Sequence, residues 1–141
     1  MLEEYNFNYI VGARIKNMQK KKNICGFKVY ENGSGTFGVV YSGITGQAAV
    51  NFLIAVKNGE VSGALLHPEI GNIDLVWGSA DAVGYGLAKI IKKHPDVVAT
   101  LAQKIFESKI IERFPGRLVL LAEDGTQRAV VDLQWFDQPK A

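Results

Sequence analysis

The sequence contains a single cysteine, Cys25, among its 141 residues. One thiol cannot form a disulfide within the chain, so we expect a fold held by its apolar core in a reducing, cytoplasmic environment. No closely spaced pairs of Cys or His residues occur, which argues against a structural zinc site. The sequence also has no Walker phosphate-binding loop. We therefore expect neither a metal nor a cofactor.

Long hydrophobic runs are also missing. The most apolar stretch, residues 39–56, is interrupted by Ser42, Thr45, Gln47 and Asn51. These polar groups predict an amphipathic segment in a folded core rather than a membrane span. The first residues are acidic and then polar, without the basic start and apolar stretch of a signal peptide. We therefore expect no membrane partner.

Neither sign of charge is in large excess, and the formal net charge is +2. Such weak basicity is compatible with a nucleic-acid partner but does not require one, because nucleic-acid-binding domains are usually more basic. Hydrophobic residues make up 48% of the chain, which is enough for one packed core. The length suits one domain.

Positive charge is densest near the N-terminus, at Lys16 and residues 20–22. We predict a basic extension over residues 1–24, followed by a single α+β domain over residues 25–141. The extension is either a solvated linker or an arm that binds phosphate.

The spacing of apolar residues predicts both strands and helices. Strands are expected at residues 27–30, 37–41, 61–66, 73–77, 110–113, 117–122 and 128–136. Helices are expected at residues 47–57, 87–94 and 95–108. Turns are expected at residues 32–35 and at Asp124-Gly125, which is a hairpin signal. Helices followed by a β-meander predict an α+β fold, in which helices pack on one face of an antiparallel sheet.

Residues 33–38 match the glycine pattern of dinucleotide-binding loops. That site needs a helix directly after the glycines, whereas residues 39–41 predict a strand. We therefore interpret the glycines as a hairpin turn. His67 precedes a proline and is predicted to be an exposed turn histidine.

A basic cluster is the strongest candidate for chemistry. It consists of Lys89, Lys92, Lys93 and His94, which lie within two turns of a predicted helix. Pro95 interrupts this helix, so His94 is expected to end it and to precede the next one. Histidine is the usual proton shuttle near neutral pH. The alternative is a structural histidine beside solvated lysines.

Gly84 and Gly86 flank the start of the same helix. Free backbone N–H groups at a helix start can hold a phosphate. The alternative is a strand-to-helix turn that needs a positive φ angle.

Two blocks of sequence are similar to a known family. Residues 70–78 contain the pattern G-x-I-x-L-V-W-G, and residues 84–95 contain G-L-A-K-I-x-x-x-H-P. With the strands at 117–121 and 130–136, they make residues 46–137 resemble the phage and mobile-element branch of the barnase–EndoU–colicin–RelE class of nuclease domains. The resemblance implies a small α+β ribonuclease-like domain of phage or mobile-element origin.

The resemblance also implies roles for single residues. His94 matches the helix histidine of the family, its candidate acid–base group, and Lys89 matches a polar or basic position one turn earlier. Trp77 and Gly78 match the strand end beside the site. Relatives continue into one more strand, which often places a hydroxyl in the site, and this chain ends before it. A truncated, inactive copy is therefore one alternative, and an exposed sheet edge predicts a homodimer or edge pairing by the N-terminal extension.

We expect metal-independent endoribonuclease activity by transesterification, with His94 as acid or base and Lys89 beside it. The residues expected to bind phosphate are Lys92, Lys93, Arg113, Arg117, Gly84 and Gly86. Both arginines have the alternative of being solvated charges at strand ends. RNA is the expected partner, and an inhibitor protein is a further candidate. The alternative function is a non-catalytic module that binds RNA or protein.

Overall fold

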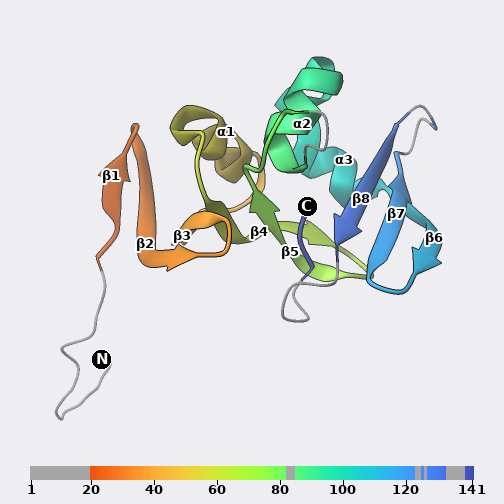
Figure 1. Cartoon of the computed structure of the whole chain (residues 1–141), viewed down its shortest axis with the longest axis horizontal. Helices are drawn as coiled ribbons and strands as arrows, with labels where there is room; N and C mark the ends of the chain where they lie inside the picture. The colour runs from red at the N-terminus through yellow and green to blue at the C-terminus, as the bar shows by residue number, and fades with distance from the viewer. Residues whose placement is uncertain (1–19, 82–84, 123–124, 126, 133–138) are drawn as a thin grey trace, which may run out of the picture.

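The computed structural model describes residues 20–81, 85–122, 125, 127–132 and 139–141 (Figure 1). Its strands are β1 (Lys22–Ile24), β2 (Phe27–Gly35), β3 (Gly38–Ser42), β4 (Glu60–His67), β5 (Gly71–Val76), β6 (Lys109–Phe114), β7 (Arg117–Leu121) and β8 (Arg128–Asp132). Its helices are α1 (Gly46–Val56), α2 (Gly86–Lys93), a 3₁₀ helix (Pro95–Thr100) and α3 (Leu101–Glu107). In the described part of the chain, no helix is long and apolar enough to cross a membrane.

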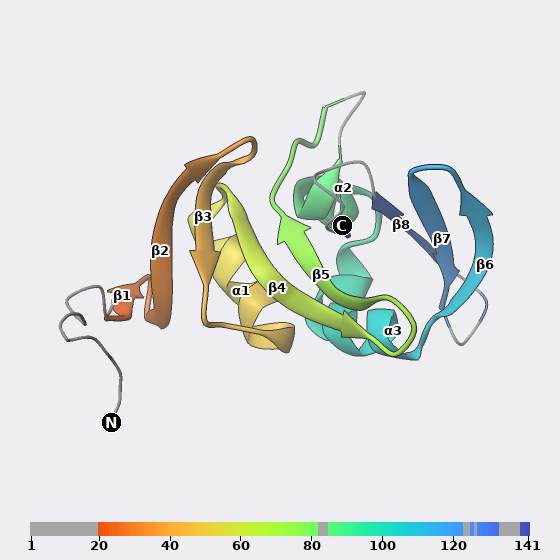
Figure 2. The same cartoon turned by 90° about the horizontal axis from the view of Figure 1, so that it is seen from below.

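The strands form two sheets rather than one. The first has the order β1-β2-β3-β4-β5, and the second has the order β6-β7-β8 (Figures 1 and 2). The expected α+β class is confirmed. The expectation of one purely antiparallel sheet is wrong, because β3 and β4 run parallel, with Val40 opposite Glu60. Helix α1 makes the crossover that a parallel pair requires.

Helix α1 packs its apolar face on the first sheet. Ala49, Val50, Phe52 and Leu53 are fully buried on this face. The Phe52 ring meets the Tyr41 ring of β3 edge-on, with the ring centres 4.8 Å apart. Such edge-to-face pairs add stability beyond that from apolar burial alone. The apolar residues whose spacing predicted this helix are therefore the residues that pack on the sheet.

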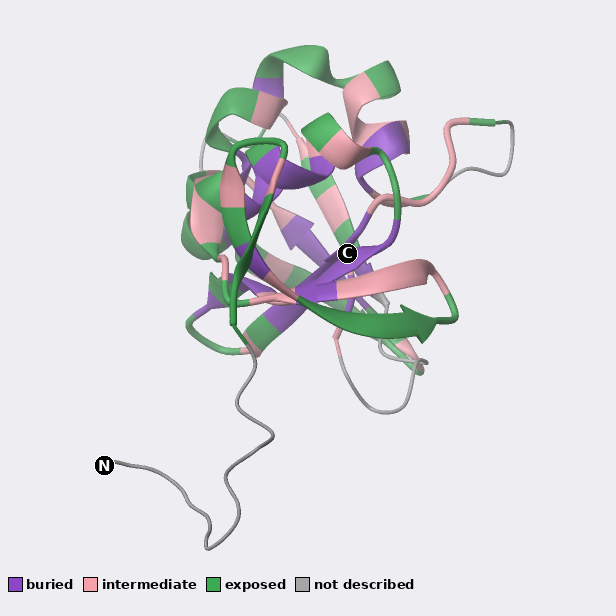
Figure 3. Ribbon diagram, turned by 90° about the vertical axis from the view of Figure 1, so that its left-hand side faces the viewer, coloured by how far each residue is buried: buried purple, intermediate pink, exposed green. Residues whose placement is uncertain are grey.

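One core connects both sheets. It continues from α1 through β4 and β5 to α3, and then to Leu118 and Leu120 of β7 and Val131 of β8. Buried segments gather where the sheets and helices meet (Figure 3). Strand β1 lies within the expected N-terminal extension and pairs with β2, so that segment joins the first sheet. Residues 1–19 of the extension lie outside the described residues.

Most element boundaries agree with the predictions to within a few residues, with two differences. The turn expected at residues 32–35 lies at Thr36 and Phe37, because β2 continues to Gly35 after a register shift that follows Glu31. The helix expected at residues 95–108 begins as a 3₁₀ helix. The hairpin of β7 with β8 is confirmed for residues 117–121 and 128–132. Asp124 and residues 133–136 lie outside the described residues.

Residues 139–141 lie along the outer edge of β5, which the sequence did not predict (Figure 1). The Asp74 N–H donates to the Pro139 carbonyl at 2.8 Å, and the Val76 N–H donates to the Ala141 carbonyl at 2.9 Å. The Ala141 N–H donates back to the Asp74 carbonyl at 2.8 Å. This short segment therefore extends the first sheet in the parallel direction.

Candidate functional site

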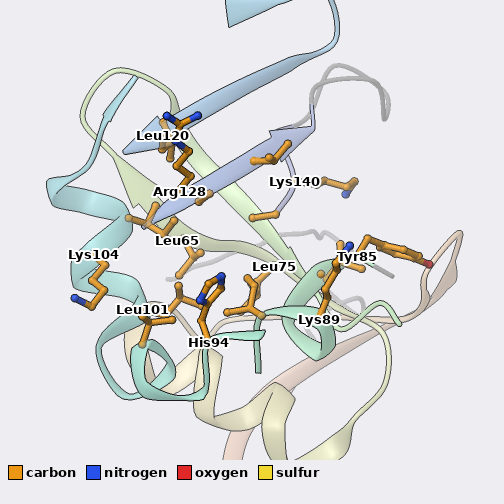
Figure 4. A pocket seen from close by; sticks show the side chains of 18 of the residues that line it. Leu65, Leu75, Tyr85, Lys89, His94, Leu101, Lys104, Leu120, Arg128 and Lys140 are labelled. Atoms are coloured by element: carbon orange, nitrogen blue, oxygen red, sulfur yellow. The ribbon is translucent and has the colours of Figure 1, made fainter. Parts of the chain in front are cut away.

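A cavity of about 890 Å³ lies between the two sheets and the helices (Figure 4). Strands β4, β5, β7 and β8, helices α2 and α3, the 3₁₀ helix and residues 140–141 all contribute to its lining. Its apolar lining includes Leu65, Leu75, Val97, Leu101, Ile105 and Leu120. Every one of these side chains is also buried in the core. The cavity is therefore built into the packing between the sheets.

The charged groups among the described lining residues are all basic. They are Lys89, Lys93, Lys104, Arg117, Arg128 and Lys140. Lys140 is paired with two buried carboxylates, and Arg128 has one long ion pair of 4.0 Å with Glu112. The lysines at 89, 93 and 104 form no ion pair with a described residue. The lining therefore favours a ligand that combines negative charge with apolar surface.

His94 lies at the break between two helices, as predicted. Its N–H donates to the Ile90 carbonyl at 2.7 Å and ends α2, while its carbonyl accepts from the Val97 N–H at 3.1 Å. Pro95 opens the next turn because it lacks the N–H that would continue α2. The imidazole makes no capping hydrogen bond and is exposed at the cavity. Figure 4 shows the ring between Leu101 and Lys89.

Helical spacing divides the lysines of the predicted basic cluster. Lys89 and Lys93 are four residues apart and both line the cavity. Lys92 lies elsewhere on α2, and its Nζ donates to the Ala80 carbonyl at 3.1 Å. The structure therefore brings His94, Lys89 and Lys93 together and leaves Lys92 outside the cavity.

Of the two arginines expected to bind phosphate, one lines the cavity and one does not. Arg117, at the start of β7, lines the cavity, and its guanidinium lies 5.0 Å from the centre of the Phe114 ring. Arg113 does not line it, and its Nη2 lies 3.5 Å from Oε1 of Glu69 in an exposed ion pair. Arg113 therefore matches the alternative of a solvated charge at a strand end.

The helix start at Gly86 packs against the end of β5. Gly86 lines the cavity, and a Cβ atom there would lie 2.6 Å from the Val76 carbonyl oxygen. Its φ of +75° matches the predicted turn. The Ala88 N–H already donates to the Trp77 carbonyl at 2.8 Å, so one of the first N–H groups of α2 is occupied. Gly84 lies outside the described residues.

The prediction for His67 is wrong. Its side chain is buried, with Nε2 2.9 Å from the Ser108 carbonyl oxygen and Nδ1 accepting from the Glu69 N–H. These contacts indicate the tautomer that carries the proton on Nε2. Strand β4 continues through His67 and turns its ring into the core, where it connects β4 to the end of α3. His67 therefore has a structural role.

Sequence reasoning missed several lining residues. Lys104 follows Leu101 by three residues on α3, so it borders the apolar face of that helix. Arg128 begins β8, and Phe37 lies in the turn before β3. Position beside an apolar helix face was a usable signal for Lys104. The other two come from segments that only the tertiary fold brings to the cavity.

Comparison of the chain with models of protein families, with curated proteins and with solved structures gave no match. Among the described residues, no three His, Cys, Asp or Glu side chains form a group that could hold a metal ion. The chemistry available at the cavity is therefore that of an imidazole, ammonium and guanidinium groups, and the hydroxyls of Thr36, Tyr85 and Ser108.

Proposed function

We propose that this protein cleaves RNA without a metal ion, with His94 as a proton-transferring group. The observation that supports this most is that the exposed His94 imidazole borders a cavity whose described charged lining is entirely basic. RNA carries one negative charge per nucleotide and is attracted to such a surface. The apolar walls suit the faces of the bases.

The two sequence blocks that resemble phage and mobile-element nuclease domains both reach this cavity. Residues 70–78 contribute Leu75 and Val76 from β5, and residues 84–95 contribute Lys89 and His94 from α2 and its end. The block at residues 84–95 therefore contains both His94 and Lys89, the residues proposed for proton transfer and phosphate binding.

The proposed reaction is a transesterification. The ribose 2′-oxygen attacks phosphorus, its proton passes to a base, and the bond from phosphorus to the 5′-oxygen breaks as an acid protonates that oxygen. The products are a 2′,3′-cyclic phosphate and a 5′-hydroxyl. His94 supplies one of the two proton transfers, and Lys89 and Lys93 stabilise the charge that develops on the phosphoryl oxygens.

Replacing His94 with Ala tests the proposal. We expect His94→Ala to lower the cleavage rate by about 10²–10⁴-fold, the usual contribution of a general acid or base, with no change in folding because the side chain is exposed. Lys89→Ala should weaken cleavage by a smaller factor. Lys92→Ala is its matched control, because it removes the same charge from the same helix outside the cavity. Cleavage of a fluorescent oligoribonucleotide gives all three rates.

The chemistry of the products provides a second readout. Cleavage should persist in excess EDTA and leave 2′,3′-cyclic phosphate ends. EDTA-sensitive cleavage that leaves 5′-phosphate ends would contradict the mechanism, as would equal rates for His94→Ala and the wild type.

Binding without cleavage is the second candidate function. Among the described lining residues, His94 is the single imidazole, and no carboxylate accompanies it. The other described lining groups that carry a transferable proton are lysines, arginines and hydroxyls, and these are less suited to the role at neutral pH. Tight binding of single-stranded RNA with no product on any sequence would favour this function.

A further inference from the structure

Tyr85 presents an exposed aromatic ring at the edge of the cavity. The residue is 51% exposed, precedes α2 and lines the cavity together with Lys89. Figure 4 shows Tyr85 at one end of the cavity and Lys104 at the other, with His94 between them. An RNA strand bound across the cavity would therefore pass the Tyr85 ring, the His94 imidazole and the lysines.

The backbone of Tyr85 is held firmly in place. Its N–H donates to the Ser79 carbonyl, and the Ser79 N–H donates to the Tyr85 carbonyl, each at 2.9 Å. Gly78 packs directly against the same residue, because a Cβ atom on Gly78 would lie 2.0 Å from the Tyr85 carbonyl oxygen. The ring is therefore presented on a fixed backbone despite its exposure.

A second aromatic ring supports the first. The Phe37 ring packs against the Tyr85 ring with their centres 6.0 Å apart and their planes at 62°. This inclined contact supports the Tyr85 ring from one side. Phe37 comes from the turn between β2 and β3, so the fold unites two aromatic residues that are distant in sequence beside the basic lining.

We propose that Tyr85 is a stacking platform for an unpaired base of the RNA strand that His94 cleaves. This inference rests on the proposed function, and it specifies the substrate class as single-stranded RNA. Proteins bind single strands by combining positive charge along the backbone with aromatic rings on which bases stack. Tyr85 supplies the ring, and Lys89, one helical turn further on, supplies charge for the adjacent phosphate.

Stacking on the Tyr85 ring predicts two binding properties: a preference for single strands and little selectivity among bases. Single strands bind better than duplexes, because bases that are already paired and stacked cannot lie against a side chain. Base identity has little influence, since every base has a π-face. The phenol hydroxyl is not required, so Phe serves at this position as well as Tyr.

The test measures binding rather than cleavage, with a 2′-O-methyl oligonucleotide that lacks the attacking hydroxyl. We expect Tyr85→Ala to weaken binding about ten-fold, which is within the usual effect of losing one base–aromatic stack. Tyr85→Phe should bind like the wild type. Tyr85→Leu, which keeps apolar bulk without a π-face, should bind like Tyr85→Ala. Thermal melts of all three variants check that folding is unchanged.

An abasic oligonucleotide series completes the experiment. One base is removed at each position in turn while every phosphate is kept. If Tyr85 stacks a base, one abasic position weakens binding to the wild type and not to Tyr85→Ala. Equal binding of Tyr85→Ala and the wild type would overturn the inference. So would a loss in Tyr85→Phe as large as in Tyr85→Ala, because the hydroxyl would then be the active group.

The two proposals fail separately. Wild-type protein that binds single strands through Tyr85 but yields no cleavage product would refute the nuclease and leave the stacking platform standing. Cleavage that depends on His94, with no effect of Tyr85→Ala on binding, would refute only the stacking platform.

Discussion

Lys140 shows how a single residue can contribute strongly to this fold. Its ammonium lies 2.7 Å from Oε1 of Glu60 and 2.6 Å from Oδ2 of Asp74, and all three side chains are at most 10% exposed. Burial alone lowers the pKa of Lys140, but the hydrogen bonds to Asp74 and Glu60, together with their charges, raise it above its ordinary value. The lysine is therefore charged, and it offsets part of the negative charge of two carboxylates that would be costly to bury without it.

We expect Lys140→Met to lower the free energy of unfolding by about 3–5 kcal/mol, since removing one partner leaves buried charge without its counterion. Lys22→Met is the control, because Lys22 forms an exposed ion pair of 3.4 Å with Glu31, and such pairs contribute about 0–1 kcal/mol. Denaturant unfolding measures both. Equal losses in the two variants would contradict a buried ion pair.

The same residue predicts a pH dependence. Because the pKa of Lys140 is raised in the folded protein, its contribution to stability is complete at neutral pH and is lost as the pH rises from 10.5 through the raised value. Burial, and then the charges of Glu31 and Cys25, also raise the pKa of Tyr41. That titration is shared by wild type and Lys140→Met, so, as the pH rises from neutral, the difference between their melting temperatures should shrink only in strongly alkaline solution.

At the scale of elements, the join between β5 and α2 positions the candidate site. Gly78 has a φ of +75°, and its backbone lies against that of Tyr85. The segment that follows β5 is therefore in direct contact with the residue that precedes α2. Lys89 and Lys93 then follow four residues apart on the cavity side, and His94 ends the helix beside them. The site therefore depends on this close approach of two backbones.

We expect Gly78→Ala to be more destabilising than Gly63→Ala. Both glycines have a positive φ, which costs a non-glycine residue about 1–2 kcal/mol. A Cβ on Gly63 meets no atom within 4 Å, whereas one on Gly78 meets the Tyr85 carbonyl at 2.0 Å. Thermal melts compare the two variants. If both lose the same stability, the contact between Gly78 and Tyr85 does not constrain the fold.

At the scale of the whole molecule, residues 139–141 cover the β5 edge (Figure 1). They also bring Lys140 to the cavity between the sheets (Figure 4). Uncovered strand edges promote pairing with other chains. The homodimer expected from an exposed sheet edge stays a prediction. The structure indicates where such pairing would begin if this segment were removed.

Deleting residues 139–141 should therefore promote self-association. The N–H groups of Asp74 and Val76 lose their carbonyl partners in this segment and become available to a second chain. Sedimentation at several concentrations should give a larger average mass for the shortened chain than for the full chain. Lys140→Met in the full chain is the control, because it removes the ion pair and keeps the backbone pairing. An unchanged mass after the deletion would contradict this account.

The sequence by itself determined the types and approximate limits of most elements, because periodicity and turn residues act locally. It also determined that His94 lies at a helix break, since Pro95 cannot supply the N–H that would continue α2. The separation of Lys89 and Lys93 from Lys92 follows from helical spacing once the cavity side of α2 is known.

Only the tertiary structure decided what these elements build. It placed the meander in its own sheet, buried His67 against α3, and brought Lys140 to two carboxylates far away in the sequence. It also united Phe37, Tyr85 and the lysines around one cavity. Local sequence cannot specify such contacts, because they depend on which faces of distant elements meet when the shared core excludes water.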